Sequence, residues 1–137
     1  MNYLLDTCVV SDFVKGEKNT LDKLKNVPPN EIAISSITVM EIQYGIALNP
    51  KYEKIIEPVL LDLLASITIL DFNQNDAVQA AKIRALLKQE GRPIGSYDVL
   101  LAGTALNNQL IFVSSNTDEF NRINNLILEN WRLPLNH

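Results

Sequence analysis

The sequence predicts an α/β fold in which a mostly parallel, twisted central sheet is flanked by helices on both faces. Short apolar runs rich in β-branched or aromatic residues alternate with longer helical patterns along the chain. Strands that are covered on both faces have this composition, and the alternation with helices favours a parallel sheet. The runs expected to form strands are 3–5, 32–34, 67–70 and 110–113, with residues 126–131 as a further edge strand.

The helical patterns between these runs differ in strength. The clearest covers residues 75–89, where Ala80, Ile83 and Leu87 share one face and Gly91 follows as a stop signal. Weaker patterns predict helices over 20–25, 38–48, 52–65 and 96–106. The interval from 31 to 67 holds helices without a good intervening strand, so we expect it to form a protruding hairpin or a subunit contact.

Length and composition indicate one domain spanning residues 1–137. A chain of this size with 47% hydrophobic and 20% charged residues can bury a core without disulfides. No apolar run reaches the length of a membrane span, and the first residues lack the pattern of a secretory signal. We therefore expect a cytoplasmic protein, and the net charge of −4 is ordinary for one.

Cysteine and histidine are too scarce for two common kinds of site. The chain has one cysteine, Cys8, and one histidine, His137, which is the last residue. Structural zinc sites and Cys/His nucleophilic catalysis both need more such residues. Any catalytic chemistry is therefore expected to use carboxylates.

Acidic residues follow several of the predicted strands. Asp6 comes directly after the first apolar run, and Glu41 lies in the helix that follows the second. Asp98 opens the 96–106 helix, and Glu119 follows the fourth run. Because the carboxyl ends of parallel strands lie at one edge of a sheet, these acids can meet in one pocket. Clustered carboxylates repel one another, so the pattern predicts a divalent-metal site.

Helix capping is the competing interpretation of each acid. Asp6 can cap the first helix, and Thr38-x-x-Glu41 has the pattern of a capping box. Ser96 can cap the following helix, with Asp98 in its first turn favoured by the helix dipole. Taken one at a time, each acid is explained better by capping than by catalysis.

Taken together, the acids are less well explained by capping. Asn116 can also cap a short turn with Asp118 and Glu119, but Asp6 and Asp98 stand among apolar residues that should be buried. No Lys or Arg lies within four residues of either. A buried carboxylate without a partner is costly, and a bound cation would remove that cost.

The same residues resemble the PIN-domain ribonucleases and, within them, the VapC toxins of bacterial toxin–antitoxin pairs. The resemblance covers nearly the whole chain and is carried by segments 4–7, 35–45, 83–86, 91–98, 116–120 and 128–131. Each segment alone is weak evidence of the resemblance, whereas the order and spacing of all the segments together are specific to the family. The segment Pro-Ile-Gly-x-x-Asp looks most like the tRNA(fMet)-specific endonucleases, which cut initiator tRNA.

The resemblance assigns the family's acidic set to particular residues. Three of its positions fall on Asp6, Glu41 and Asp98. The fourth, often Asp, is Asn116 here, and Glu119 matches a further acid that precedes a Phe. Because an amide adds no charge, the choice between one and two metal ions stays open. Two further positions are Asp118, the alternative to Glu119, and Cys8, a small side chain where the family commonly has Asn.

The resemblance implies an endoribonuclease that depends on Mg²⁺, or on Mn²⁺ in its place. It implies tRNA as the expected substrate and cleavage that leaves 5′-phosphate and 3′-hydroxyl ends. Asp6 and Asp98 would be the metal ligands, Glu41 would position or deprotonate water, and Asn116 and Glu119 would complete the outer shell. A cognate VapB-type antitoxin would neutralise the protein, which would form a homodimer and reach operator DNA only through that antitoxin. Apart from the resemblance, candidate phosphate contacts are Lys15, Lys18, Arg84, Lys88 and Arg92, and for each of them a solvated helix face is an equally good interpretation.

Other readings of the sequence fit less well. A receiver domain needs paired acids after the first strand, and a haloacid-dehalogenase-type phosphatase needs Asp-x-Asp there, whereas this chain has Asp6-Thr7-Cys8. Dinucleotide binding has no Gly-x-Gly-x-x-Gly support. The serious alternative is a PIN-fold binding module that has lost catalysis. Asn116 favours that alternative, and the retained acids argue against it.

Overall fold

The computed structural model describes residues 1–134, and within them five strands form one parallel sheet. The strand order is β3-β2-β1-β4-β5, with every neighbouring pair parallel. The strands are β1 (Tyr3–Leu5), β2 (Ile32–Ser35), β3 (Thr68–Leu70), β4 (Ile111–Val113) and β5 (Leu128–Glu129). The predicted α/β class is confirmed, and each predicted strand is present within two residues except for the last, which is shorter than expected.

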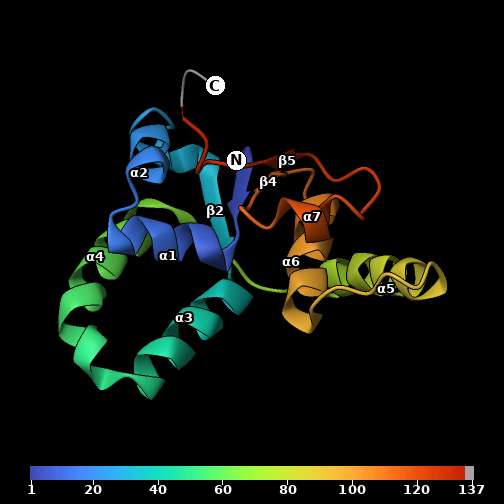
Figure 1. Cartoon of the computed structure of the whole chain (residues 1–137), viewed down its shortest axis with the longest axis horizontal. Coiled ribbons are helices and arrows are strands. Elements are labelled where there is room, and N and C mark those ends of the chain that lie inside the picture. The colour runs from blue at the N-terminus through green and yellow to red at the C-terminus, as the bar shows by residue number, and fades with distance from the viewer. Residues whose placement is uncertain (135–137) are drawn as a thin grey trace.

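Helices cover both faces of the sheet (Figure 1). They are α1 (Thr7–Lys15), α2 (Lys18–Lys25), α3 (Ser36–Leu48), α4 (Glu53–Ser66), α5 (Gln74–Gln89), α6 (Ser96–Asn107) and α7 (Thr117–Phe120), with short 3₁₀ turns η1 (Pro29–Glu31) and η2 (Pro50–Tyr52). Helix α1 matches none of the helical ranges assigned from the sequence, although Asp6 was expected to cap a first helix. Within residues 1–134, no helix is both long and apolar enough to span a bilayer.

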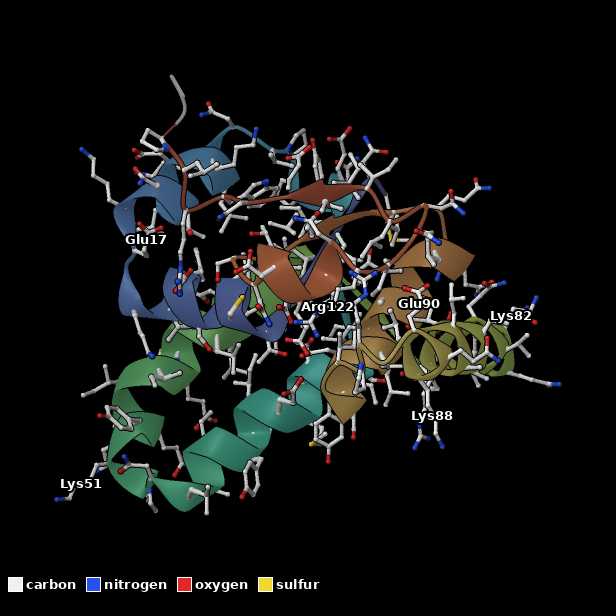
Figure 2. All side chains as sticks on the ribbon, turned by 45° about the vertical axis from the view of Figure 1, so that its right-hand side comes forward. Glu17, Lys51, Lys82, Lys88, Glu90 and Arg122 are labelled. Carbon is white, nitrogen blue, oxygen red and sulfur yellow. The ribbon has the colours of Figure 1, made fainter. Side chains whose placement is uncertain are left out.

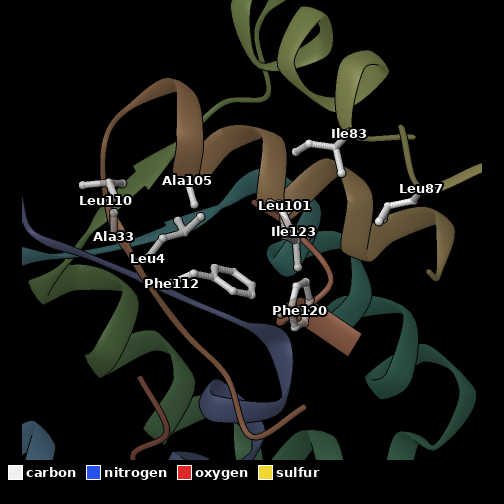
Figure 3. Close-up of a cluster of buried hydrophobic side chains, with 11 residues drawn as sticks. Leu4, Ala33, Ile83, Leu87, Leu101, Ala105, Leu110, Phe112, Phe120 and Ile123 are labelled. Atoms are coloured by element: carbon white, nitrogen blue, oxygen red, sulfur yellow. The ribbon is translucent and has the colours of Figure 1, made fainter. Parts of the chain in front are cut away.

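Alternate strand residues build two separate cores. Leu4 and Phe112 lie on one side of the sheet with α5 and α6, whereas Leu5 and Val113 lie on the other with α1 and α4. This alternation follows from the two-residue period of a strand. In Figure 3, Phe112 packs against Phe120 beneath α6, with ring centroids 4.6 Å apart at an interplanar angle of 63°. Both faces of β1 and β4 are therefore buried, which explains why these strands read as continuous apolar runs.

Helices α5 and α6 form a closely packed pair beside the sheet. Asp76, which is fully buried, completes a capping box with Asn73 at the start of α5. Its Oδ1 also accepts a hydrogen bond from Asn107 Nδ2 at 2.7 Å, at the end of α6. The middle of α6 consists of small residues. Ala102 and Ala105 pack on the sheet, but Gly103 faces the backbone of α5 at Ala80.

Helices α3 and α4 project away from the sheet edge as a V-shaped pair (Figure 1). The predicted protruding hairpin is therefore present. Leu60 and Leu63 of α4 are buried in the core, whereas Val59 and Leu61 are exposed. Helix α4 thus packs one apolar face into the core and leaves apolar residues of its other face exposed to solvent.

Candidate active site

The acidic residues converge where the strand order reverses. Strand β1 pairs with β2 on one side and β4 on the other, so the connections leave the central strand in opposite directions. Ligands of open α/β sheets bind at such a switch point, outside the carboxyl ends of the strands. Asp6 follows β1 and Ser114 follows β4 at this place, where Ser114 donates to Asp6, and Thr7 of α1 donates to Glu41 of α3 beside them.

Asp6 is held rigidly by three donors. Its Oδ1 accepts the backbone N–H of Thr7 at 2.8 Å, so the predicted capping role is confirmed. Its Oδ2 accepts Ser114 Oγ at 2.7 Å and lies 3.4 Å from Cys8 Sγ. Burial raises the pKa of Asp6, while these donors act in the opposite direction. The carboxylate is thus fixed in place and short of compensating positive charge.

Asp98 lies in the first turn of α6 among other acids. Burial raises its pKa to about 7, and the negative charges of Asp6, Glu119 and Glu41 add to the effect. A hydrogen bond with Glu119 also favours the protonated form. Repulsion from three separate acids requires that all four carboxyl groups lie in one neighbourhood, as the sequence predicted.

The raised pKa of Asp98 predicts how the stability of the metal-free protein depends on pH. The ordinary pKa is 3.8, so between pH 4 and about 7 the folded state holds a proton on Asp98 that the unfolded chain has released. The free energy of unfolding should therefore fall as pH rises through this window. Thermal unfolding in EDTA, with Asp98→Asn as reference, measures the effect; parallel pH profiles for both proteins would contradict it.

Glu41 does not form the predicted capping box. Helix α3 begins at Ser36, with Ser35 as its N-cap, so Glu41 lies in the second turn and cannot reach the helix start. Its Oε1 instead accepts Thr7 Oγ1 at 2.8 Å. The capping interpretation of Glu41 is wrong because the helix begins two residues earlier than its sequence pattern indicates.

Glu119 links the start of α6 to α7. Its Oε1 accepts the backbone N–H of Gly95 at 2.7 Å, and its Oε2 accepts the side-chain amide of Asn116 in a short hydrogen bond. Gly95 is the N-cap of α6, so the predicted cap at Ser96 is wrong: Ser96 is the first helical residue. Asp118 is exposed to solvent and Glu119 is half-buried. Of the two candidate acids, Glu119 is the one beside Asp98.

The donor set fits a hard divalent cation. Within residues 1–134, neither Asp6 nor Asp98 forms an ion pair, and no three Asp, Glu, His or Cys side chains stand as a ready-made ligand cluster. Mg²⁺ does not need such a cluster, because it usually binds through one or two carboxylates and keeps several waters. Asp6 and Asp98 supply that number, and the surrounding acids provide a negative charge that a cation would offset.

The remaining residues singled out from the sequence lie around the site or away from it. Cys8 is half-buried beside Asp6, and burial raises the pKa of its thiol, as suits an inert neighbour rather than a nucleophile. Lys88 projects into solvent from α5 (Figure 2). Arg92 pairs with Glu90 at 2.9 Å. His137 lies outside the described residues.

Arg84 and Lys88 line a cavity of about 540 Å³ between α5 and the start of α6. Ser96 and Val99 of α6 also line it, whereas Asp98 does not. Its walls are otherwise mainly apolar. The phosphate contacts predicted for Arg84 and Lys88 stay predictions.

Ser114 and Thr7 contribute contacts that the sequence reading did not assign. Ser114 is fully buried, donates to Asp6 and accepts the backbone N–H of Asn116 at 3.0 Å. Ser114 could have been predicted by the pattern used for the acids, because it is a polar residue directly after the apolar run of β4, and β4 pairs with β1. Thr7 could not be found in this way, because its partner Glu41 is 34 residues distant.

Comparison with known proteins places this chain in a family. Residues 3–126 match the model of the PIN domain. A tRNA(fMet)-specific endonuclease VapC from Shigella flexneri is 32% identical over 131 residues, which are 96% of this chain and 98% of that protein. Ribonuclease VapC2 from Rickettsia felis is 39% identical over 137 residues with the same coverage.

Solved structures agree with the sequence relatives. A chain in the crystal structure of VapBC2 from Rickettsia felis, bound to a promoter DNA fragment, superposes with a TM-score of 0.87 at 35% identity, covering 96% of this chain and 99% of that one. DNA-bound VapBC from Salmonella typhimurium gives 0.87 at 30% identity, covering 96% and 98%. The chain belongs to the PIN-domain family, in its VapC group.

Proposed function

We propose that this protein is a Mg²⁺-dependent endoribonuclease toxin that hydrolyses phosphodiester bonds in tRNA, with initiator tRNA as the first candidate. The observation that carries the proposal is the convergence of Asp6, Glu41, Asp98 and Glu119, where burial and the neighbouring negative charges raise the pKa of Asp98 to about 7. The relatives named as ribonucleases support the reaction class, and one named for tRNA(fMet) supports the substrate.

Asp6 and Asp98 would hold the ion, and each residue around them has a distinct task. When bound, Mg²⁺ would activate water and offset the charge that grows on the phosphate during in-line attack. Asp98 must release its proton for this, and Glu119 holds the start of α6 so that its carboxyl group stays in position. Glu41 would orient the attacking water or take its proton. No covalent intermediate with the protein is needed.

We further propose that a VapB-type antitoxin neutralises the enzyme in the cytoplasm. The related solved structures are VapBC complexes, some of them bound to DNA. A cluster of acids with no ion pair among the described residues would accept a basic antitoxin side chain. Contact with operator DNA would then be made through the antitoxin. A homodimer would use the exposed apolar residues of the α3–α4 pair.

The presence of an amide, Asn116, at the position of the fourth acid favours a catalytically inactive binding module instead. This amide donates to Glu119 where a fourth carboxylate would add charge. The two functions differ in one measurable respect, because only the enzyme needs a divalent ion for its effect on RNA.

Incubation of antitoxin-free protein with purified total tRNA tests the proposal. Discrete cuts are expected with Mg²⁺ and none with EDTA, and sequencing of the 5′-phosphorylated ends identifies the tRNA. If folded protein leaves both tRNA and total RNA intact over a range of Mg²⁺ and Mn²⁺ concentrations, the nuclease proposal is wrong and the binding module replaces it.

Gly95 offers a milder perturbation of the same site. A Cβ placed there would lie 2.9 Å from Asp98 Oδ2 and 3.7 Å from Glu119 Oε1. The backbone, with φ −56° and ψ 149°, accepts alanine without strain, so Gly95→Ala should fold normally but displace the carboxyl group of Asp98. We expect the cleavage rate to fall about 10- to 100-fold, as misplacement of reacting groups by about 1 Å does.

Gly45→Ala is the matched control for Gly95→Ala. It lies within α3, and a Cβ there would meet nothing within 4 Å. It should cleave at the wild-type rate and gain about 0.5–1 kcal/mol of stability from better helix propensity. Equal rates for Gly95→Ala and Gly45→Ala would contradict the assigned position of Asp98.

A further inference from the structure

Thr7 contacts two of the carboxylates in the site at once. Its backbone N–H donates to Asp6 Oδ1 and its hydroxyl to Glu41 Oε1, each at 2.8 Å. Asp6 follows the central strand, whereas Glu41 lies on α3, 34 residues beyond Thr7. Thr7 is therefore a direct physical link between the end of β1 and the helix that carries Glu41.

Thr38 supports this link from the opposite side. It is fully buried, and its Oγ1 lies 3.2 Å from Thr7 Oγ1. A hydroxyl has one proton, and a carboxylate only accepts, so the shorter contact takes the proton of Thr7. The proton of Thr38 is then directed at Thr7. Thr38 and Glu41 are three residues apart on one face of α3, which places both beside Thr7.

We infer that Thr7 is a positioning residue that fixes the Glu41 carboxylate relative to Asp6, with Thr38 holding the Thr7 hydroxyl in the donating orientation. The inference rests on the proposed function, in which Glu41 acts on the attacking water. Within residues 1–134, Thr7 is the one side chain that hydrogen-bonds Glu41, which is half-buried and has several rotatable bonds. Without this contact, Glu41 would sample several rotamers and hold its oxygen near the reacting water less often.

Thr7→Val tests the inference, because it keeps the shape of the side chain and the backbone contact to Asp6 but removes the hydroxyl. We expect the turnover number to fall about 10- to 100-fold, the usual effect of losing a supporting hydrogen bond around an active site. KM for tRNA and the affinity for Mn²⁺ should change less than about threefold, since neither depends on Glu41 being fixed. Thr7→Ser should restore the rate, and Thr38→Val should show a smaller loss of turnover.

A double-mutant cycle separates positioning of Glu41 from a general effect on the fold. If Thr7 acts through Glu41, adding Thr7→Val to Glu41→Ala should lower the residual rate less than about twofold. Thr104→Val is the matched control, because it removes another buried threonine hydroxyl, one that donates to the Leu100 carbonyl at 3.3 Å, and it should keep wild-type turnover. Additive losses, no rescue by Ser, or a loss confined to metal affinity would overturn the inference.

A measurement that needs no activity keeps the inference separate from the proposed function. Three-bond couplings of the Glu41 side chain, measured by ¹³C NMR, should report one rotamer in the wild type and averaging in Thr7→Val. Equal averaging in both proteins would overturn the positioning role. Absence of RNA cleavage by the wild type, with the couplings as expected, would count against the nuclease alone.

Discussion

Replacing Asp98 by Asn is expected to abolish RNA cleavage while leaving the protein folded. Asn keeps the size of the side chain but removes a charge that the proposed metal site needs. Loss of one group that stabilises developing charge typically lowers a rate by about 10²- to 10³-fold, and we expect the upper end because Asp98 is one of two ligands. Single-turnover cleavage of tRNA under saturating Mg²⁺ measures the change.

The same substitution is expected to stabilise the metal-free protein. The pKa of about 7 means that, at pH 8, the folded chain carries a carboxylate whose charge is opposed by burial and by three neighbouring acids. Removing such a functional but unfavourable charge should raise the free energy of unfolding by about 1 kcal/mol. Lost activity together with raised stability distinguishes a functional residue from a structural one.

Asp118→Asn is the matched control for Asp98→Asn. Asp118 is exposed on α7, next in sequence to Glu119, and its conversion to an amide changes the net charge by the same amount. It should cleave at the wild-type rate and show an unchanged melting temperature. If Asp118→Asn loses as much activity as Asp98→Asn, the assignment of the acids is wrong.

Gly103 gives the largest expected effect on stability. A Cβ at this position would lie 2.8 Å from the backbone N of Ala80, 2.9 Å from its Cβ and 2.9 Å from the carbonyl oxygen of Asp76. Most of these atoms belong to the backbone of α5, which cannot relieve a clash by changing rotamer as a long side chain can. Gly103→Ala should therefore force the helices apart and cost about 2–3 kcal/mol of stability, as overpacking of a close contact does.

Chemical denaturation of Gly103→Ala beside Gly45→Ala measures this cost. Both changes add one methyl group within a helix, but nothing lies within 4 Å of the added methyl at Gly45. Since α6 also carries Asp98, the shift should lower the affinity for Mn²⁺ as well. Equal denaturation midpoints for the two variants would contradict the close approach of α5 and α6.

Local patterns in the sequence predicted the parallel sheet and most of the helices, although not the range of α1. The buried strands β1 and β4 read as apolar runs because helices cover both of their faces. The face formed by Ala80, Ile83 and Leu87 was predicted correctly because it follows the helical period. The acidic cluster was also predicted, since parallel strands bring their carboxyl ends to one edge whatever the detail of the loops.

Contacts between distant segments could not be predicted in this way. The patterns that suggested caps at Glu41 and Ser96 are local, and in the structure neither residue caps a helix. The hydroxyl of Thr7 donates a hydrogen bond to Glu41, and the backbone N–H of Gly95 donates one to Glu119. Both contacts depend on the sheet, which places the segments that carry these residues next to one another. No spacing in the sequence encodes either distance.

Titration with Mn²⁺, followed by electron paramagnetic resonance, tests the central claim that Asp6 and Asp98 hold a divalent ion. Wild-type protein and Asp118→Asn should bind with the same affinity, whereas Asp6→Asn and Asp98→Asn should each bind about tenfold more weakly or worse, as the loss of a charged ligand predicts. All variants should remain folded by circular dichroism. Equal binding by the wild type and by both site variants would contradict the account.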